Sequence, residues 1–357
     1  MSQNLSLFLA RKNIEISVNR YLIKAMSAMA QGLFCSLLIG TILSTLGKQL
    51  ELEILVTVGK FAAQMAGPAM SVAIGYALQA DPLVLFSMTV VGAAANSLGG
   101  AGGPLAVLII AIIAAECGKS VSRETSVDIL VTPAVTVFMG VVLSVLIAPP
   151  IGEAASTLGR LIMYATELQP LTMGILVSAL VGIALTLPIS SAAICAALGL
   201  TGLAGGAAVA GCCAQMVGFA VISFKVNSWG GLISQGLGTS MLQMPNIVRN
   251  PRIWIAPILT SCITGPVATC LFNFQMNGAA VASGMGTCGL VGQLGVYAGW
   301  VSDIESGFKH SITLSDWTAL FLISFILPAL ICPLINLVLK KMHWVRDEDF
   351  RLKVAGN

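Results

Sequence analysis

The sequence predicts an all-α polytopic membrane protein with about 8 to 10 transmembrane helices, two re-entrant hairpins and an inverted internal repeat. Of its 357 residues, 57% are hydrophobic and only 9% are charged, whereas about 25% are charged in a typical soluble protein. Long uncharged runs and two glycine clusters complete the pattern. This composition excludes a soluble enzyme, a disordered regulator and a nucleic-acid-binding protein.

Uncharged runs of membrane-spanning length recur along the chain. A helix needs about 20 mainly apolar residues to cross the hydrocarbon core. Runs of this length are 25–47, 54–80 with Lys60 as its one charge, 129–152, 168–224, 253–302 and 317–339. The two longest runs have room for at least two passages each, and we expect a bend near residues 187–191, where Pro188 lies.

Two stretches fit a simple span poorly because glycines divide them, and the second of them lies inside the run 253–302. Gly99, Gly100, Gly102 and Gly103 interrupt residues 82–117, leaving arms of about a dozen residues that are too short to cross. A second cluster, Gly284, Gly286 and Gly289, divides residues 274–300 in the same way. Non-helical backbone at membrane depth requires a protein or water partner, so we expect hairpins whose tips face a cavity. The alternative is that these glycines allow close helix packing.

The order of short sequence features indicates two related halves. Ala30-Gln31 and Gly67-Pro68 precede the first glycine cluster, and Ala214-Gln215 and Gly265-Pro266 precede the second. An inverted arrangement with both termini inside places 14 of the 18 lysines and arginines in the cytoplasm, as the positive-inside rule favours. We therefore expect cytoplasmic N- and C-termini and one hairpin entering from each face.

These features divide the chain into five expected segments. They are an amphipathic N-terminal helix at 1–24, a first transmembrane repeat at 25–152, a linker with an interfacial helix and a kinked hairpin at 153–207, a second repeat at 208–341, and a cytoplasmic tail at 342–357.

The residue types favour binding over catalysis. The two histidines, His310 and His343, fall in a loop and in the tail, and no acid/base pair falls within a span. Ser283 precedes a glycine as an intramembrane nucleophile would, but no histidine in the spans can activate it. The nine cysteines have no zinc-site spacing. We expect no catalytic residue, no metal and no cofactor.

Neutral hydrogen-bonding side chains lie at apolar depth instead, and they favour a small polar solute such as a sugar. The groups of this kind are Gln31, Gln64, Asn96, Ser190, Ser191, Gln215, Asn273, Gln275, Asn277, Thr287 and Gln293. Any one of them has the alternative of a helix-to-helix hydrogen bond. Lys60 either faces the solute or extends its charge to the membrane surface.

The segment between Lys225 and Arg249 carries no charge, but it is too polar for a lipid-facing span. Its apolar residues recur about every four positions from Trp229, which predicts an amphipathic helix. It is either an interfacial helix or a pore-lining element that presents Asn227 and Gln235.

Three runs of sequence resemble a known family. They are Asn227-Ser228-Trp229-Gly230-Gly231-Leu232-Ile233-Ser234-Gln235-Gly236 with its continuation to Val248, Leu187-Pro188-Ile189-Ser190-Ser191-Ala192, and Gly284-Met285-Gly286-Thr287-Cys288-Gly289. They resemble the PfoR-like membrane proteins, which are classed with the IIC permease components of the bacterial sugar phosphotransferase system. The resemblance extends over nearly the whole chain.

The resemblance implies a multi-pass protein of the bacterial inner membrane, a homodimer, with hairpins and broken helices around a sugar-sized site. Separate phosphotransferase subunits are possible partners, besides the solute and the lipid bilayer. We expect an alternating-access permease for a sugar or related metabolite; the alternative is a membrane-embedded solute sensor. The expected solute-binding residues are Lys60, Gln64, Asn96, Gly99, Gly100, Ser190, Ser191, Asn227, Gln235, Gly284, Gly286 and Thr287.

Overall fold

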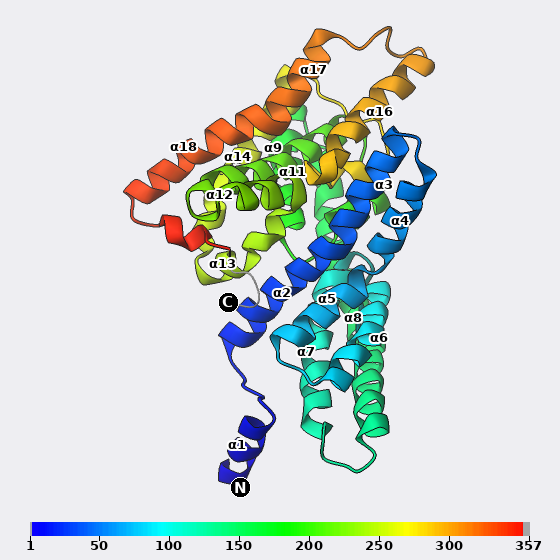
Figure 1. Cartoon of the computed structure of the whole chain (residues 1–357). Coiled ribbons are helices and arrows are strands. Elements are labelled where there is room, and N and C mark those ends of the chain that lie inside the picture. The colour runs from blue at the N-terminus through cyan, green and yellow to red at the C-terminus, as the bar shows by residue number, and fades with distance from the viewer. Residues whose placement is uncertain (1, 353–357) are drawn as a thin grey trace. The chain divides into compact units, whose positions relative to one another are not determined.

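The computed structural model describes residues 2–352, with side chains from residue 7 onward, and confirms an all-α polytopic membrane protein (Figure 1). These residues form helices, turns and loops, and no β-strand is found among them. Six stretches there are long and apolar enough to cross a membrane: Asn19–Gln49, Pro82–Val121, Asp128–Thr166, Gly202–Ile222, Pro251–Leu271 and Leu314–Lys341. Pro82–Val121 contains two helices, and Pro170–Thr186 is a shorter apolar helix.

The described chain forms two compact units. The first takes in the residues up to Gly40 and Glu53–Ala154, and the second Thr41–Leu52 and Ala155–Leu352. The first unit contains α1 (Ser2–Arg11), η1 (Asn19–Lys24), α2 (Ala25–Leu33), η2 (Phe34–Leu38), α4 (Glu53–Gln64), α5 (Ala66–Ala77), α6 (Pro82–Gly99), η3 (Gly100–Gly102) and α7 (Gly103–Val121). Two helices run from one unit into the other: α3 (Ile39–Gln49) and α8 (Asp128–Thr166).

The first glycine cluster forms the turn of a helical hairpin. Helices α6 and α7 pack side by side, and η3 joins them (Figure 1). Their lengths of 18 and 19 residues correspond to about 27 Å each. The expected arm length of about a dozen residues was therefore wrong, because both helices extend further than the glycine spacing indicated.

Helix α8 packs against this hairpin and continues past residue 152. A Cβ atom on Gly140 would lie 2.4 Å from Val91, and one on Gly102 would lie 2.7 Å from the Ile151 carbonyl oxygen. These glycines therefore permit close helix contacts. The helix runs unbroken for 39 residues, with Pro149 and Pro150 inside it, so residues 153–166 continue α8 instead of forming a separate interfacial helix.

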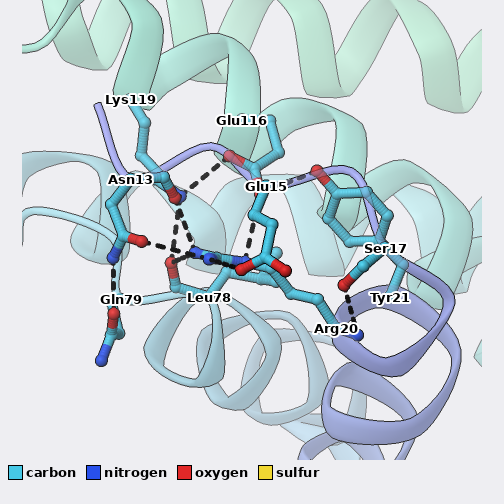
Figure 2. Close-up of polar contacts among 9 residues, drawn as sticks. All are labelled: Asn13, Glu15, Ser17, Arg20, Tyr21, Leu78, Gln79, Glu116 and Lys119. Carbon is cyan, nitrogen blue, oxygen red and sulfur yellow. Dashed lines mark hydrogen bonds and ion pairs between the residues drawn. The ribbon is translucent and has the colours of Figure 1, made fainter. Parts of the chain in front are cut away.

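The N-terminal segment expected as one amphipathic helix at 1–24 is divided within the described residues. Helix α1 ends at Arg11, and a loop leads to Asn19. A buried charge cluster holds this loop (Figure 2). Lys119 lies 2.8 Å from Glu116, and Arg20 lies 3.9 Å from it. Both cations donate to the Leu78 carbonyl oxygen at the end of α5, at 2.8 and 3.0 Å, and both donate to the Asn13 carbonyl oxygen at 2.7 Å.

The second unit is built around α11 (Gly202–Ile222), which is buried along nearly its whole length. The other elements of this unit are α9 (Pro170–Thr186), α10 (Ser191–Ala197), α12 (Phe224–Ile233), η4 (Ser234–Gly238), η5 (Ser240–Gln243), α13 (Met244–Arg249), η6 (Pro251–Trp254), α14 (Ile255–Pro266), η7 (Val267–Leu271), α15 (Ala280–Ser283), η8 (Cys288–Leu290), α16 (Val291–Glu305), α17 (Leu314–Phe321), η9 (Leu322–Ile326), α18 (Leu327–Lys341) and η10 (Asp347–Phe350). Helices α9, α14 and α18 pack against α11.

Small residues set the spacing of α9, α11 and α14. A Cβ atom on Gly211 would lie 1.9 Å from the Ser178 carbonyl oxygen, and one on Gly265 would lie 2.1 Å from that of Gly174. The Ser178 hydroxyl donates to the Ser261 carbonyl oxygen at 2.7 Å. Close approach and interhelical hydrogen bonds are the forces that hold membrane helices together.

The second glycine cluster forms a different structure from the first. Between η7 and α16 the chain has only the four-residue helix α15, turns and η8. An extended stretch precedes α15, where Met276 pairs with Gly202 through two hydrogen bonds of 2.9 Å. The arm before the second glycine cluster is therefore not a continuous helix, because residues 273–279 are not helical and only α15 follows them.

Candidate functional site

A cavity of about 560 Å³ lies in the second unit, where the segment after η7, the end of α16 and the start of α17 meet. The residues that line it are Phe272, Asn273, Phe274, Gln275, Asn277, Trp300, Asp303, Phe308, Lys309, Ser315, Asp316 and Ala319. Pockets for small molecules occupy about 300 to 1,000 Å³, so the volume of the cavity lies within the range for a small-molecule site.

One wall of the cavity is the extended segment 272–277, which alternates apolar and polar residues. Phe274 and Met276 are buried, whereas Asn273 and Gln275 are exposed. Asn273, Phe274 and Gln275 line the cavity, and Met276 does not. Successive side chains of an extended chain point to opposite faces. Asn273 has a φ of 45°, which asparagine tolerates better than most residues. Asn273, Gln275 and Asn277 are among the polar groups expected at apolar depth, and the structure places all three in the cavity lining, but they are not among the expected solute-binding residues.

Glycines bring this wall close to the neighbouring helices. A Cβ atom on Gly206 of α11 would lie 1.9 Å from the Phe274 carbonyl oxygen. On the α16 side, a Cβ atom on Gly299 would lie 2.8 Å from the backbone nitrogen of Asn277. The wall is therefore held by backbone packing, and its polar side chains project from a fixed support.

An amide and a carboxylate meet across the cavity. The Asn277 side-chain nitrogen donates to Oδ2 of Asp303 at 2.8 Å and to Oε1 of Gln275 at 3.3 Å. Asp303 comes from the last turn of α16. These groups provide hydrogen-bond acceptors and donors of the kind that hydroxyl groups require.

The opposite wall carries an ion pair at the start of α17. Lys309 Nζ lies 2.6 Å from Oδ1 of Asp316. The other carboxylate oxygen accepts hydrogen bonds from the backbone and hydroxyl of Thr313, at 2.7 and 2.8 Å, in a capping box. Both carboxylate oxygens of Asp316 are therefore engaged, one in the ion pair with Lys309 and the other in the cap of α17.

Aromatic rings form the floor. Trp300 is 5% exposed, and Lys309 Nζ lies 5.5 Å from its ring centroid. Trp317 meets Trp300 edge-to-face at 5.4 Å, a geometry that aromatic pairs favour. Trp300 also belongs to the hydrophobic cluster that includes Phe274, Met276 and Ile323. A polar rim on an apolar, rigid floor is typical of a small-molecule site.

None of the twelve predicted solute-binding residues lines this cavity. In the first unit, Lys60 and Gln64 are exposed on α4, and Asn96, Gly99 and Gly100 lie at the end of α6 or just after it. A Cβ atom on Gly152 of α8 would lie 2.7 Å from the Gly99 carbonyl oxygen. Gly100 has a φ of 50° and open space around it. Close packing thus applies to Gly99 but not to Gly100.

In the second unit, the predicted residues around the second glycine cluster lie in close contact. The Ser191 hydroxyl donates to the Gly284 carbonyl oxygen at 2.7 Å, and Thr287 donates to that of Gly236. A Cβ atom on Gly286, whose φ is 54°, would lie 2.6 Å from Cys212. Ser190 caps α10 by accepting from the Ala193 amide. Here the backbone amides are enclosed by protein.

Asn227 and Gln235 belong to a buried polar network. Asn227 donates to the Phe350 carbonyl oxygen at 2.8 Å and accepts from the Leu352 amide at 2.9 Å. Gln243 joins Phe350 to Gln235, at 3.0 and 2.8 Å. Gln235 is fully buried, whereas Trp229 is 68% exposed. The region from α12 to α13 therefore turns its amides inward and binds the segment 344–352, which we name the C-terminal strap.

A pH effect on the C-terminal strap follows from Asp347. Hydrogen bonds from Lys340 and Lys225 hold the pKa of Asp347 below its ordinary value of 3.8. A carboxylate with a lowered pKa stabilises the folded state above its unfolded pKa, and this contribution is lost as pH falls through the folded value. We expect amide-exchange protection over 345–352 to decrease below pH 3.8. Protection that is equal at pH 6 and pH 3 in Asp347→Asn, but not in the wild type, would assign the change to Asp347.

Comparison with known proteins identifies the family. The profile of the family described as "Phosphotransferase system, EIIC" matches residues 23–352. Comparisons with curated proteins and with solved structures return no match. The match covers both units, including the cavity and the polar network of α12 and α13. This chain therefore belongs to the EIIC family, the membrane-embedded sugar-transport components of the phosphotransferase system.

Proposed function

We propose that this protein is a permease that moves a small, polar solute, a sugar or related metabolite, by alternating access. Membership of the EIIC family supports the class of solute, and the cavity between residues 272 and 319 carries the proposal. Its volume of about 560 Å³ and its amide, carboxylate and aromatic lining are suited to a polyhydroxylated molecule.

The twelve predicted residues remain part of this proposal as solute contacts outside the cavity, those of the first unit within that unit and those of the second unit within the second. Thr287, at the tip of the second glycine cluster, precedes the start of α16, and the cavity residue Asp303 lies in the last turn of this helix. Helix α16 has 15 residues and a length of about 22 Å. In this proposal the enclosed tip opens when the permease changes state, so that solute passes from the cavity along α16. A location in the bacterial inner membrane with cytoplasmic termini, a homodimer and separate phosphotransferase subunits complete the proposal.

Uptake into proteoliposomes tests this function. We expect the purified chain to admit labelled hexoses, and Asn277→Ala to reduce initial uptake at subsaturating solute about tenfold, because it removes a donor to solute and to Asp303. Gln49→Ala, which truncates an exposed amide of α3 away from the cavity, serves as the matched control and keeps wild-type uptake.

Two other outcomes would count against parts of this proposal, the first against the permease and the second against the cavity. Binding of hexose without accumulation would favour the sensor. Equal uptake by Asn277→Ala and Gln49→Ala would show that the cavity lies off the solute pathway.

A further inference from the structure

The cavity has an unbalanced charge. Its ionisable lining consists of the carboxylates of Asp303 and Asp316 and the ammonium of Lys309. Two negative charges and one positive charge leave a net charge of −1 on the lining. Because a cavity excludes part of the solvent and salt, charges inside it are screened less than at an open surface.

The negative charge that no cation in the cavity neutralises is that of Asp303. Lys309 and Asp316 neutralise each other at 2.6 Å, and Thr313 satisfies the second oxygen of Asp316. Asp303 receives one hydrogen bond from a neutral amide, that of Asn277. In the part of the chain that the structure describes, its carboxylate makes no ion pair within 4.0 Å.

The one cation of the cavity is already engaged. Lys309 binds Asp316 and lies over the Trp300 ring, so an incoming anion would have to break the ion pair and the cation–π contact together. An incoming hydroxyl or ammonium group breaks neither, and it can donate to the carboxylate of Asp303.

We infer that Asp303 sets the charge specificity of the cavity: it binds polyhydroxylated solutes that are neutral or carry an ammonium group, and it rejects those that carry a carboxylate. This inference rests on the proposed function of the cavity. Asp303 acts through a hydrogen bond accepted from the solute and through repulsion of a second negative charge.

Calorimetric titration of the purified full-length protein at pH 7 tests the inference. The probes are hexose, 2-amino-2-deoxyhexose and hexuronate in the gluco, galacto and manno series, which keep one ring and change its charge. In any series that binds, we expect the hexuronate to bind at least about tenfold more weakly than the neutral hexose. Asp303→Asn keeps an acceptor for Asn277 but removes the charge, and it should reduce this ratio to about threefold or less.

Glu305→Gln is the matched control, since it removes one negative charge from an exposed residue of α16 that does not line the cavity. It should keep the wild-type ratio. Hexuronate that binds wild type as tightly as hexose, or an equal ratio in Asp303→Asn and wild type, overturns the charge specificity while leaving a sugar site in place. Absence of binding in all three series overturns the sugar site itself.

Discussion

Glu116→Gln is expected to be the most damaging single substitution, lowering the free energy of unfolding by about 3–5 kcal/mol. The change preserves shape but removes the carboxylate that faces Arg20 and Lys119, whose side chains are 10% and 3% exposed. Lys119 would then keep only carbonyl oxygens as partners, and Arg20 would keep carbonyl and amide oxygens and the exposed carboxylate of Glu15 at 3.9 Å. Thermal denaturation in detergent, followed by circular dichroism, measures the loss.

Two further variants separate this explanation from a general sensitivity to charge. Glu124→Gln removes a carboxylate that pairs with Arg11 and Lys12 but is exposed to solvent, so we expect little change in the midpoint. Adding Lys119→Met to Glu116→Gln removes one uncompensated cation and should recover part of the stability. An unchanged midpoint in Glu116→Gln would contradict the role of the cluster shown in Figure 2.

Gly211→Ala is expected to cost about 3 kcal/mol, at the upper end of the range for overpacked cores. Its new methyl group would lie 1.9 Å from the Ser178 carbonyl oxygen, so α9 and α11 would have to separate. That separation would also weaken the hydrogen bond of the Ser178 hydroxyl to Ser261. The same denaturation measurement reports the effect.

Gly230→Ala provides the comparison, because a Cβ atom at this helical position meets nothing within 4 Å. We expect it to unfold at or above the wild-type midpoint, since alanine favours a helix over glycine. If both alanine variants unfold at the same temperature, close backbone approach does not determine how α9 and α11 pack.

Much of the fold could be predicted because the bilayer limits the choices. Few charges and long uncharged runs indicated an all-α membrane protein, and the first glycine cluster indicated the turn between α6 and α7. The break near Pro188 lies where α9 ends and α10 begins. These features depend on local composition, which a single sequence displays.

The remaining features depend on contacts between distant residues. Glu116 pairs with Arg20 about 100 positions away, and the side chain of Asn227 donates to the carbonyl oxygen of Phe350. The cavity combines a segment after η7 with two carboxylates, Asp303 and Asp316, that lie just outside the uncharged runs 253–302 and 317–339. The strict alternation from Phe272 to Asn277 is typical of an extended segment, but it lies inside a long uncharged run that equally fits a membrane helix.

The most direct measurement of the central claim is hexose binding by a protein whose cavity has been filled. Ser315→Trp places a large ring at a residue that lines the cavity. Thr318→Trp places the same ring at an exposed position of α17 outside it. If the cavity binds the solute, Ser315→Trp loses binding and uptake of hexose while Thr318→Trp keeps both. Wild-type binding and uptake by Ser315→Trp would contradict it.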